Sequence, residues 1–188
     1  MRSLLVAGAA ALLIGLPVAQ ANVYNFTYNN TDGSVAAHGQ LTTTPESTPL
    51  YGPFQLVTGI SGYRNGEPII GMVPLPANLL VGGYATSPDG LWYYDNLLFP
   101  GGVPGGAPGG AAPNQYLDND GLAFTVQDGS SSVNVYTAGT YIDGIYNGGY
   151  ILTPVQVSVT EATPEPGVYG VLAIGLSGLF IKLCRRRA

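Results

Sequence analysis

Positive charge is nearly absent from the central part of the sequence. Only 9% of the 188 residues are Asp, Glu, Lys or Arg, against roughly 25% in an average soluble domain. Arg64 is the only basic residue between residues 22 and 162, whereas ten acidic residues lie in that stretch. An acidic surface is repelled by the phosphate backbone, so the composition excludes nucleic acid as a partner.

Cysteine and histidine each occur once. Cys184 lies close to the C-terminus and has no second cysteine with which to form a disulfide or a thiolate metal site. His38 has no second imidazole to complete a metal site, and the sequence contains no Gly-x-Ser-x-Gly motif. We therefore expect a protein that is not an enzyme and holds no cofactor. A glycan hydrolase with two catalytic carboxylates remains an alternative, because the acidic residues offer many pairs.

Glycine and proline are abundant, with 28 and 15 residues, and favour turns over helices. Three Asx-Gly pairs lie between β-rich runs, and such pairs readily take the positive φ angles of a tight hairpin. The pairs are Asp32-Gly33, Asn65-Gly66 and Asp128-Gly129. They predict strand pairs at 23–28 with 34–41, 55–63 with 68–73, and 122–127 with 132–137. A last strand is expected at 150–160.

Large apolar residues fall at every second position in the predicted strands, as in Leu122, Phe124 and Val126. Such alternation is typical of strands with one buried face, and short strands of this kind need a second layer to cover that face. The fold class is therefore all-β, as a small antiparallel β-sandwich or a Greek-key barrel. Residues 101–113 hold no side chains able to build a core, which predicts a flexible Gly/Pro-rich surface loop within one domain.

The first 21 residues have the three parts of a secretory signal peptide. Arg2 supplies the positive charge, an uncharged apolar run follows, and Ala19 and Ala21 are the small residues that signal peptidase accepts. Cleavage after Ala21 would leave a domain over residues 22–162. An uncleaved membrane anchor is the alternative, but the apolar run is short for a hydrocarbon layer of about 30 Å.

Residues 163–188 form a second three-part segment. Pro164, Glu165 and Pro166 end any preceding strand, and an uncharged stretch predicts a transmembrane helix at about 168–184. The basic tail contains Arg185, Arg186 and Arg187. Basic residues beside a membrane helix are held in the cytoplasm, so the domain is expected on the outside.

This order of Pro-Glu-Pro motif, apolar helix and terminal arginines resembles the PEP-CTERM sorting domain of bacteria that possess exosortase. The resemblance covers about the last 26 residues. It implies transient anchoring in the inner membrane, cleavage near residues 164–166 by an exosortase-type membrane protease, and transfer to the cell surface or the extracellular space. In that family the segment accompanies exopolysaccharide production and biofilm formation. An ordinary C-terminal anchor is the alternative.

The aromatic cluster Trp92, Tyr93 and Tyr94 has two interpretations. Aromatic rings with polar tips suit a half-exposed platform on which sugar rings stack. Aromatic residues also fill the cores of β-domains, so some of the three are expected to point inward. Our leading hypothesis is a structural or adhesive surface or matrix protein, with a carbohydrate-binding module that uses this cluster as the second hypothesis.

Asp118 and Asp120 begin a run, Asp-Asn-Asp-Gly, that resembles the start of a calcium-binding loop. Leu122 then occupies the next ligand position, and no Glu stands where the loop needs a bidentate ligand. The run is therefore predicted to be an Asx-rich turn without a metal, while calcium in another geometry remains the alternative.

Overall fold

The computed structural model describes residues 21–79, 83–103, 115–127 and 132–162. All of the regular secondary structure in these four segments is β-strand, and they contain no helix long and apolar enough to cross a bilayer. Several sequence predictions concern residues outside the described ranges. These are Ala19, most of the signal peptide, residues 104–113 of the Gly/Pro-rich loop, the sorting motif at 164–166, the helix at 168–184 and the arginines at 185–187.

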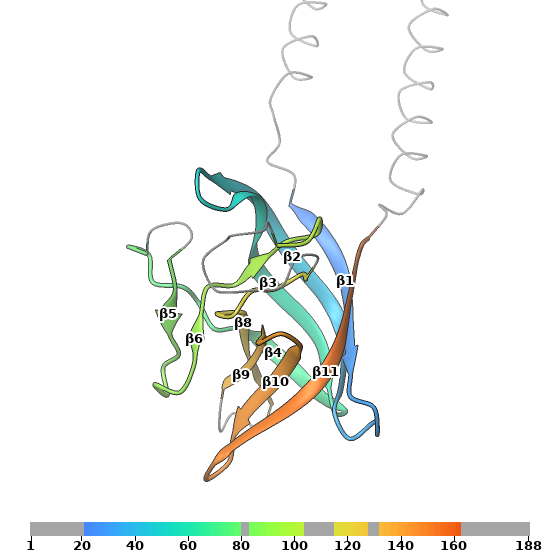
Figure 1. Cartoon of the computed structure of the whole chain (residues 1–188). Helices are drawn as coiled ribbons and strands as arrows, with labels where there is room; N and C mark the ends of the chain where they lie inside the picture. The colour runs from blue at the N-terminus through green and yellow to red at the C-terminus, as the bar shows by residue number, and fades with distance from the viewer. Residues whose placement is uncertain (1–20, 80–82, 104–114, 128–131, 163–188) are drawn as a thin grey trace, which may run out of the picture.

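Eight strands form a closed antiparallel barrel (Figure 1). They are β1 (Asn22–Asn29), β2 (Ala36–Thr48), β3 (Gly52–Arg64), β4 (Glu67–Met72), β8 (Leu122–Val126), β9 (Ser132–Thr137), β10 (Tyr141–Tyr146) and β11 (Tyr150–Glu161). Each strand pairs with the next barrel strand along the chain, and β11 returns to pair with β1. The connectivity is therefore that of an up-and-down barrel.

The prediction of an all-β, antiparallel fold is confirmed, and so is a barrel as one of its two alternatives, but the sandwich and the Greek-key connectivity are wrong. A sandwich needs two separate sheets, whereas β2 pairs with both β1 and β3 and so joins the ends of one sheet. A Greek key needs a strand that crosses to a distant neighbour, and none of the eight barrel strands does so. Closure removes the free sheet edges and covers the apolar faces without a second layer.

The hairpin predictions hold where they can be checked. Asp32-Gly33 joins β1 to β2, and Asn65-Gly66 joins β3 to β4 with positive φ angles at both turn residues, 51° and 84°. Asp128-Gly129 lies outside the described residues, but the flanking strands β8 and β9 do pair. β10 was not predicted from the sequence, and it holds Asp143-Gly144 within a strand instead of at a turn.

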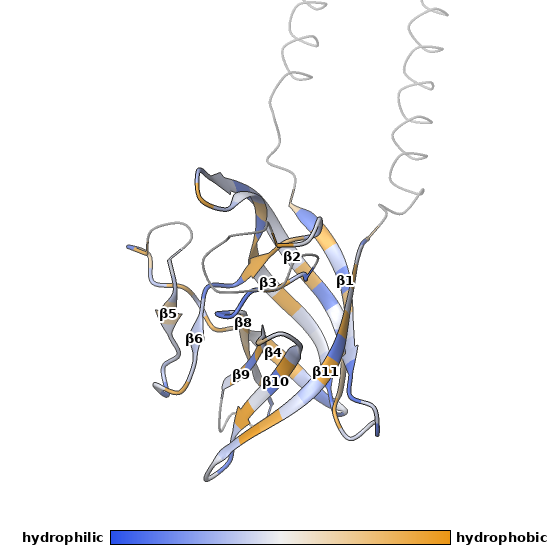
Figure 2. Cartoon of the chain, viewed as in Figure 1, coloured by the Kyte–Doolittle hydropathy of each residue, from blue (hydrophilic) through white to orange (hydrophobic). Residues whose placement is uncertain are grey.

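The barrel lumen is a packed apolar core. Its residues alternate along the strands, so hydrophobic and more polar positions follow one another in Figure 2. One void of about 20 Å³ lies in the lumen, lined by apolar side chains that include Phe26, Leu41 and Phe124. That volume is close to the space of one water molecule. A larger hollow of about 430 Å³ lies where β3 and β4 diverge, and its lining includes Val57 and Asn96.

The chain between β4 and β8 forms an insertion on the outside of the barrel wall (Figure 1). It contains three two-residue strands, β5 (Ala85–Thr86), β6 (Tyr93–Tyr94) and β7 (Leu97–Leu98). β5 and β6 form a separate two-stranded sheet, while β7 adds to β3. The insertion is thus joined to the barrel through the pairing of β7 with β3.

Asn96 fills a gap in the barrel wall. β3 and β4 pair only next to their turn, at Tyr63 with Pro68 and at Arg64 with Glu67. Further along, the Asn96 carbonyl accepts the Val57 N–H at 2.9 Å, and the Asn96 side chain bonds the Val73 carbonyl and the Ala123 N–H, both at 3.0 Å. The insertion therefore completes the wall between β3 and β8, and this contact fixes the position of the neighbouring Asp95.

Candidate functional site

Three carboxylates from two separate parts of the chain converge beside the barrel. Asp118 and Asp120 lie just before β8, and Asp95 lies in the turn between β6 and β7. One carboxylate oxygen from each residue lies within 4.8 Å of the other two. Asp95 and Asp118 are buried, with 1% and 0% of their surfaces exposed, while Asp120 is half-buried. We call these three residues the carboxylate cluster.

Backbone hydrogen bonds hold the carboxylate cluster in place. Asp118 Oδ1 accepts the N–H groups of Asp120 and Gly121, both at 3.1 Å, so the predicted Asx turn is confirmed. Asp95 Oδ1 accepts the Leu97 N–H at 3.1 Å, and the Asn96 N–H donates to the Gly121 carbonyl at 3.0 Å. Two short turns therefore bind each other and direct their side chains to one place.

Gly121 is the residue that allows this close approach. Its φ angle is +76°, and an added Cβ would lie 2.4 Å from the Val135 carbonyl oxygen. Any other residue would push the turn away from β9. The Asp-Asn-Asp-Gly run thus has a structural reason for Gly121 as well as for Asp118.

The second oxygens of Asp95 and Asp118 have no hydrogen-bond partner, although both atoms are buried. Burial raises the pKa of Asp95 well above its ordinary value, and the charge of Asp118 adds to this effect. Burial also raises the pKa of Asp118, and burial together with Asp118 raises the pKa of Asp120 to about 6. Desolvation and mutual repulsion therefore oppose three negative charges at this place.

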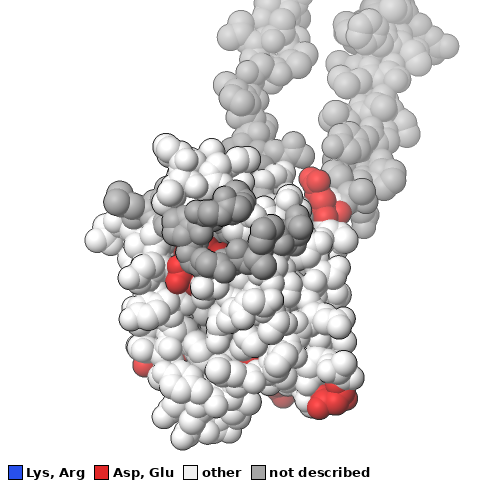
Figure 3. Space-filling view, in the orientation of Figure 1, with Lys and Arg blue, Asp and Glu red and all other residues white. Residues whose placement is uncertain are grey.

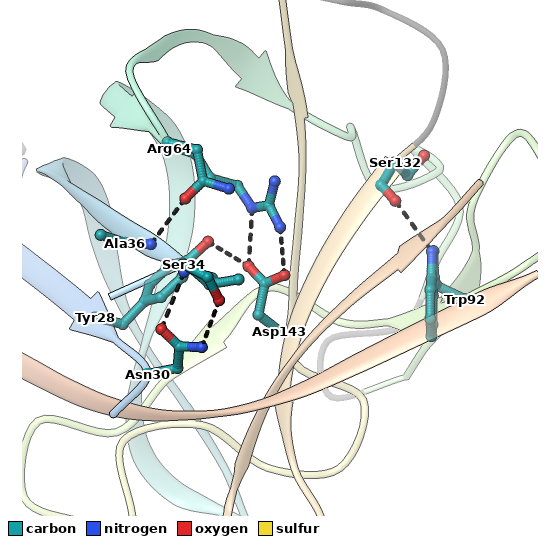
Figure 4. A network of polar contacts seen from close by, with 10 residues as sticks. Tyr28, Asn30, Ser34, Ala36, Arg64, Trp92, Ser132 and Asp143 are labelled. Carbon is teal, nitrogen blue, oxygen red and sulfur yellow. Dashed lines mark hydrogen bonds and ion pairs between the residues drawn. The ribbon is translucent and has the colours of Figure 1, made fainter. Parts of the chain in front are cut away.

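A different arrangement neutralises the buried Asp143 inside the barrel. Arg64 Nε and Nη2 donate to the two oxygens of Asp143 at 2.9 and 2.6 Å, and the Tyr28 hydroxyl donates to Asp143 at 2.6 Å (Figure 4). Burial would lower the pKa of Arg64, but the hydrogen bonds and charge of Asp143 outweigh it and raise the pKa. Burial, followed by the Asp143 charge, raises the pKa of Tyr28 well above its ordinary value. This paired network is a structural part of the lumen.

Arg64, which pairs with Asp143, is the single Lys or Arg in the described ranges. On the face drawn in Figure 3 no Lys or Arg is visible, and acidic atoms show in only a few places. Within the described residues, the carboxylate cluster consequently has no side-chain cation to balance it. Besides the residues outside the described ranges, protons and metal ions from solution are the possible sources of positive charge.

The structure does not present Trp92, Tyr93 and Tyr94 as one exposed platform. Trp92 is buried against Gly144, where an added Cβ would lie 2.7 Å from its ring, and its indole N–H donates to the Ser132 carbonyl at 3.1 Å. Tyr94 is also buried, and its hydroxyl donates to the Pro74 carbonyl at 2.8 Å. Only Tyr93 is exposed, at 61% of its surface.

Two pairs of exposed tyrosines lie near this region. Tyr93 packs edge to face against the exposed Tyr84, with ring centroids 5.2 Å apart. Tyr150 packs in the same manner against Tyr146 and against Trp92, at 5.4 and 5.3 Å. Trp92 therefore supports part of an aromatic surface from below instead of forming the surface itself.

The site reached by sequence reasoning was incomplete. The structure brings Asp118 and Asp120 together as the sequence analysis considered, but it adds Asp95, which no ligand spacing connects to them. Comparison of the chain with protein-family models, with curated proteins and with solved structures finds no match.

Proposed function

We propose that this chain is an exported bacterial protein that reaches the cell surface or extracellular matrix through exosortase-type processing, where it has a structural or adhesive role. The observation that carries the proposal is the C-terminal segment, in which Pro164-Glu165-Pro166 precedes an apolar stretch and three arginines. Its partners are signal peptidase, an exosortase-type protease, the inner membrane during transit, and exopolysaccharide at the destination. No enzymatic activity is part of the proposal.

The position of the barrel ends supports this processing scheme. β1 starts at Asn22, directly after the proposed signal-peptidase site at Ala21. At the other end Glu161 is paired with Tyr24, and the Ala162 N–H donates to the Val23 carbonyl at 2.8 Å. Cleavage after Ala21 and near Pro164 would therefore leave all eight barrel strands intact.

The outer surface supports the adhesive role. The void in the lumen has about the volume of one water molecule, so we expect contacts with a matrix on the outside of the barrel and on the insertion. Tyr84 and Tyr93 offer two exposed rings in edge-to-face contact, and an exposed aromatic face can stack on a sugar ring. Carbohydrate binding through this pair is the second candidate function.

Expression of the full chain in an exosortase-containing host and in the same host without exosortase tests the proposal. Mass spectrometry and fractionation should find a tail-trimmed extracellular form only in the first host. Glu165→Gln should reduce trimming, whereas the matched change Glu161→Gln, four residues earlier, should not. An intact membrane-bound tail in both hosts, or equal trimming in both, would reduce the segment to an ordinary anchor.

Two assays on the folded, released form test the non-enzymatic role. Retention on host exopolysaccharide supports adhesion, and its loss in Tyr93→Ala would assign the contact to the tyrosine pair. Release of sugar from the polysaccharide, abolished by one Asp or Glu substitution, would instead establish a glycan hydrolase.

A further inference from the structure

We propose that the carboxylate cluster of Asp95, Asp118 and Asp120 is a calcium-binding site. This inference concerns the barrel itself and does not depend on how the chain is exported. It rests on the separation of the three carboxylates, on two buried oxygens without partners, and on the connection between the cluster and the barrel wall.

The spacing of the oxygens suits a single calcium ion. Calcium takes oxygen ligands at about 2.3–2.6 Å, so two ligands of one ion lie at most about 4.6–5.2 Å apart. The three carboxylate oxygens lie within 4.8 Å of one another. They can therefore all contact one ion, and half-buried Asp120 leaves a side on which water or backbone oxygens complete the coordination.

The unpartnered oxygens point independently to a cation. In Asp95 and in Asp118, Oδ1 accepts backbone N–H groups that form the turn, while Oδ2 is buried and accepts nothing. A buried carboxylate oxygen without a partner is unfavourable unless a charge or a hydrogen bond compensates it. A calcium ion between the two Oδ2 atoms would supply that compensation.

A proton shared by Asp95 and Asp118 is the competing explanation, because the two carboxylates lie close enough to form a hydrogen bond with each other when one of them is protonated. One proton would satisfy both Oδ2 atoms but would leave two negative charges among three adjacent carboxylates. A divalent cation neutralises more of the cluster and also uses Asp120. Calcium fits better than magnesium, because magnesium demands near-ideal octahedral geometry and usually keeps several of its waters, while Asp95 and Asp118 are buried.

The bound ion would join two parts of the chain that close the barrel. Asp95 is the neighbour of Asn96, which bridges β3, Val73 and Ala123 in the gap of the wall. Asp118 and Asp120 lie at the start of β8. Calcium would hold the insertion against β8 and so stabilise the closed wall. Extracellular modules bind calcium with dissociation constants of about 10⁻⁴–10⁻³ M. With a similar affinity, this site would be saturated only where calcium is plentiful.

Calorimetric titration and thermal unfolding of the full chain, purified in mild detergent, test the site with calcium alone and with magnesium alone. We expect one calcium per chain and a rise in melting temperature of about 10 °C when calcium is roughly 100 times its dissociation constant. Magnesium should bind at least about tenfold more weakly, in line with its stricter geometry.

Three variants make the test specific. Asp95→Asn and Asp120→Asn should abolish the calcium-induced rise, while Glu67→Gln, an exposed carboxylate on β4, should keep it. If Asp95→Asn fails to fold, Asp120→Asn decides the matter because that side chain is only half-buried. The proposal would be overturned if the folded wild-type chain bound no calcium at a concentration ten times above about 10⁻³ M. It would also be overturned if both Asp variants kept the full calcium-induced rise in melting temperature.

Discussion

Buried carboxylates have partners within the chain in the barrel lumen but lack them at the base of the insertion. In the lumen, Asp143 has a bidentate guanidinium and a tyrosine hydroxyl as partners. At the base of the insertion, Asp95 and Asp118 have one oxygen each in a turn and one oxygen with no partner. Both regions are buried, so the difference lies in the source of the compensating charge.

This difference shows which region is complete by itself. The Arg64–Asp143 pair satisfies both of its members from within the chain. The carboxylate cluster concentrates negative charge next to apolar core residues and depends on protons or cations from solution. Equivalent substitutions in the two regions should therefore change the free energy of unfolding by different amounts, and in part with opposite sign.

The largest effect is expected in the lumen. Removing one partner of a buried ion pair leaves the other charge uncompensated, at a cost of roughly 3–5 kcal/mol. We expect both Arg64→Met and Asp143→Asn to lower the free energy of unfolding by about this amount, measured by urea denaturation. A loss below about 1 kcal/mol, as for exposed pairs, would show that solvent reaches the pair and would remove the contrast between the regions.

The same Asp-to-Asn change in the carboxylate cluster should have the opposite sign in calcium-free buffer. Asp118→Asn keeps the Oδ1 that accepts the turn N–H groups and removes one of three adjacent charges. We expect a gain in unfolding free energy of about 1 kcal/mol, since weaker repulsion accompanies the lost charge. Millimolar calcium should reverse the order of wild type and variant. A loss of stability in calcium-free buffer would mean that the carboxylates are already compensated.

The pH dependence of stability should also come from the carboxylate cluster. The pKa values of its three aspartates are raised in the folded chain, to about 6 for Asp120. The folded chain therefore binds protons more tightly than the unfolded chain, whose Asp pKa is about 3.9. Stability in calcium-free buffer should fall as the pH rises from about 5 to about 7.5.

Urea denaturation at several pH values measures this trend, and saturating calcium should flatten it by excluding protons from the site. Asp32 and Asp89 do not contribute in this window, because hydrogen bonds to Ser34 and to Ser87 and Ser132 lower their pKa values despite any burial. A stability that rises between these two pH values would contradict the assignment.

The smallest effect on stability is expected at the exposed tyrosines. Tyr93→Ala removes an exposed ring and should change the unfolding free energy by less than about 0.5 kcal/mol. Retention on exopolysaccharide should fall severalfold if the Tyr84–Tyr93 pair contacts sugar. Tyr63→Ala, at a comparably exposed tyrosine that packs on His38, serves as the control and should retain binding. Equal retention of Tyr93→Ala and Tyr63→Ala on exopolysaccharide would show that the Tyr84–Tyr93 pair does not bind carbohydrate.

Local sequence signals predicted the barrel strands better than the way in which the barrel closes. Asp32-Gly33 and Asn65-Gly66 define their hairpins because the turn geometry is set by adjacent residues. Closure depends on the pairing of β1 with β11, which lie more than a hundred residues apart and carry no local sign of partnership. β10 was not predicted for a related reason, since Arg64 and Trp92 explain its Asp143 and Gly144 only in three dimensions.

The candidate site shows the same limit. Asp118 and Asp120 are close in sequence and were visible as a partial calcium motif, which the absence of later ligands then weakened. Asp95 comes from the insertion, where Asn96 fixes its position by contacts with β3 and β8. The residue that completes the carboxylate cluster therefore follows from the tertiary fold and not from motif spacing.

A crystal structure of the protein grown with calcium, with terbium as an anomalous substitute in a second crystal, tests the central contrast most directly. We expect one metal peak at the carboxylate cluster, with an oxygen from each of Asp95, Asp118 and Asp120 at about 2.3–2.6 Å, and no metal beside Asp143. A cluster without a metal in both crystals, its Asp95 and Asp118 oxygens in hydrogen-bond contact, would show that a shared proton compensates the buried charge and would contradict the calcium site.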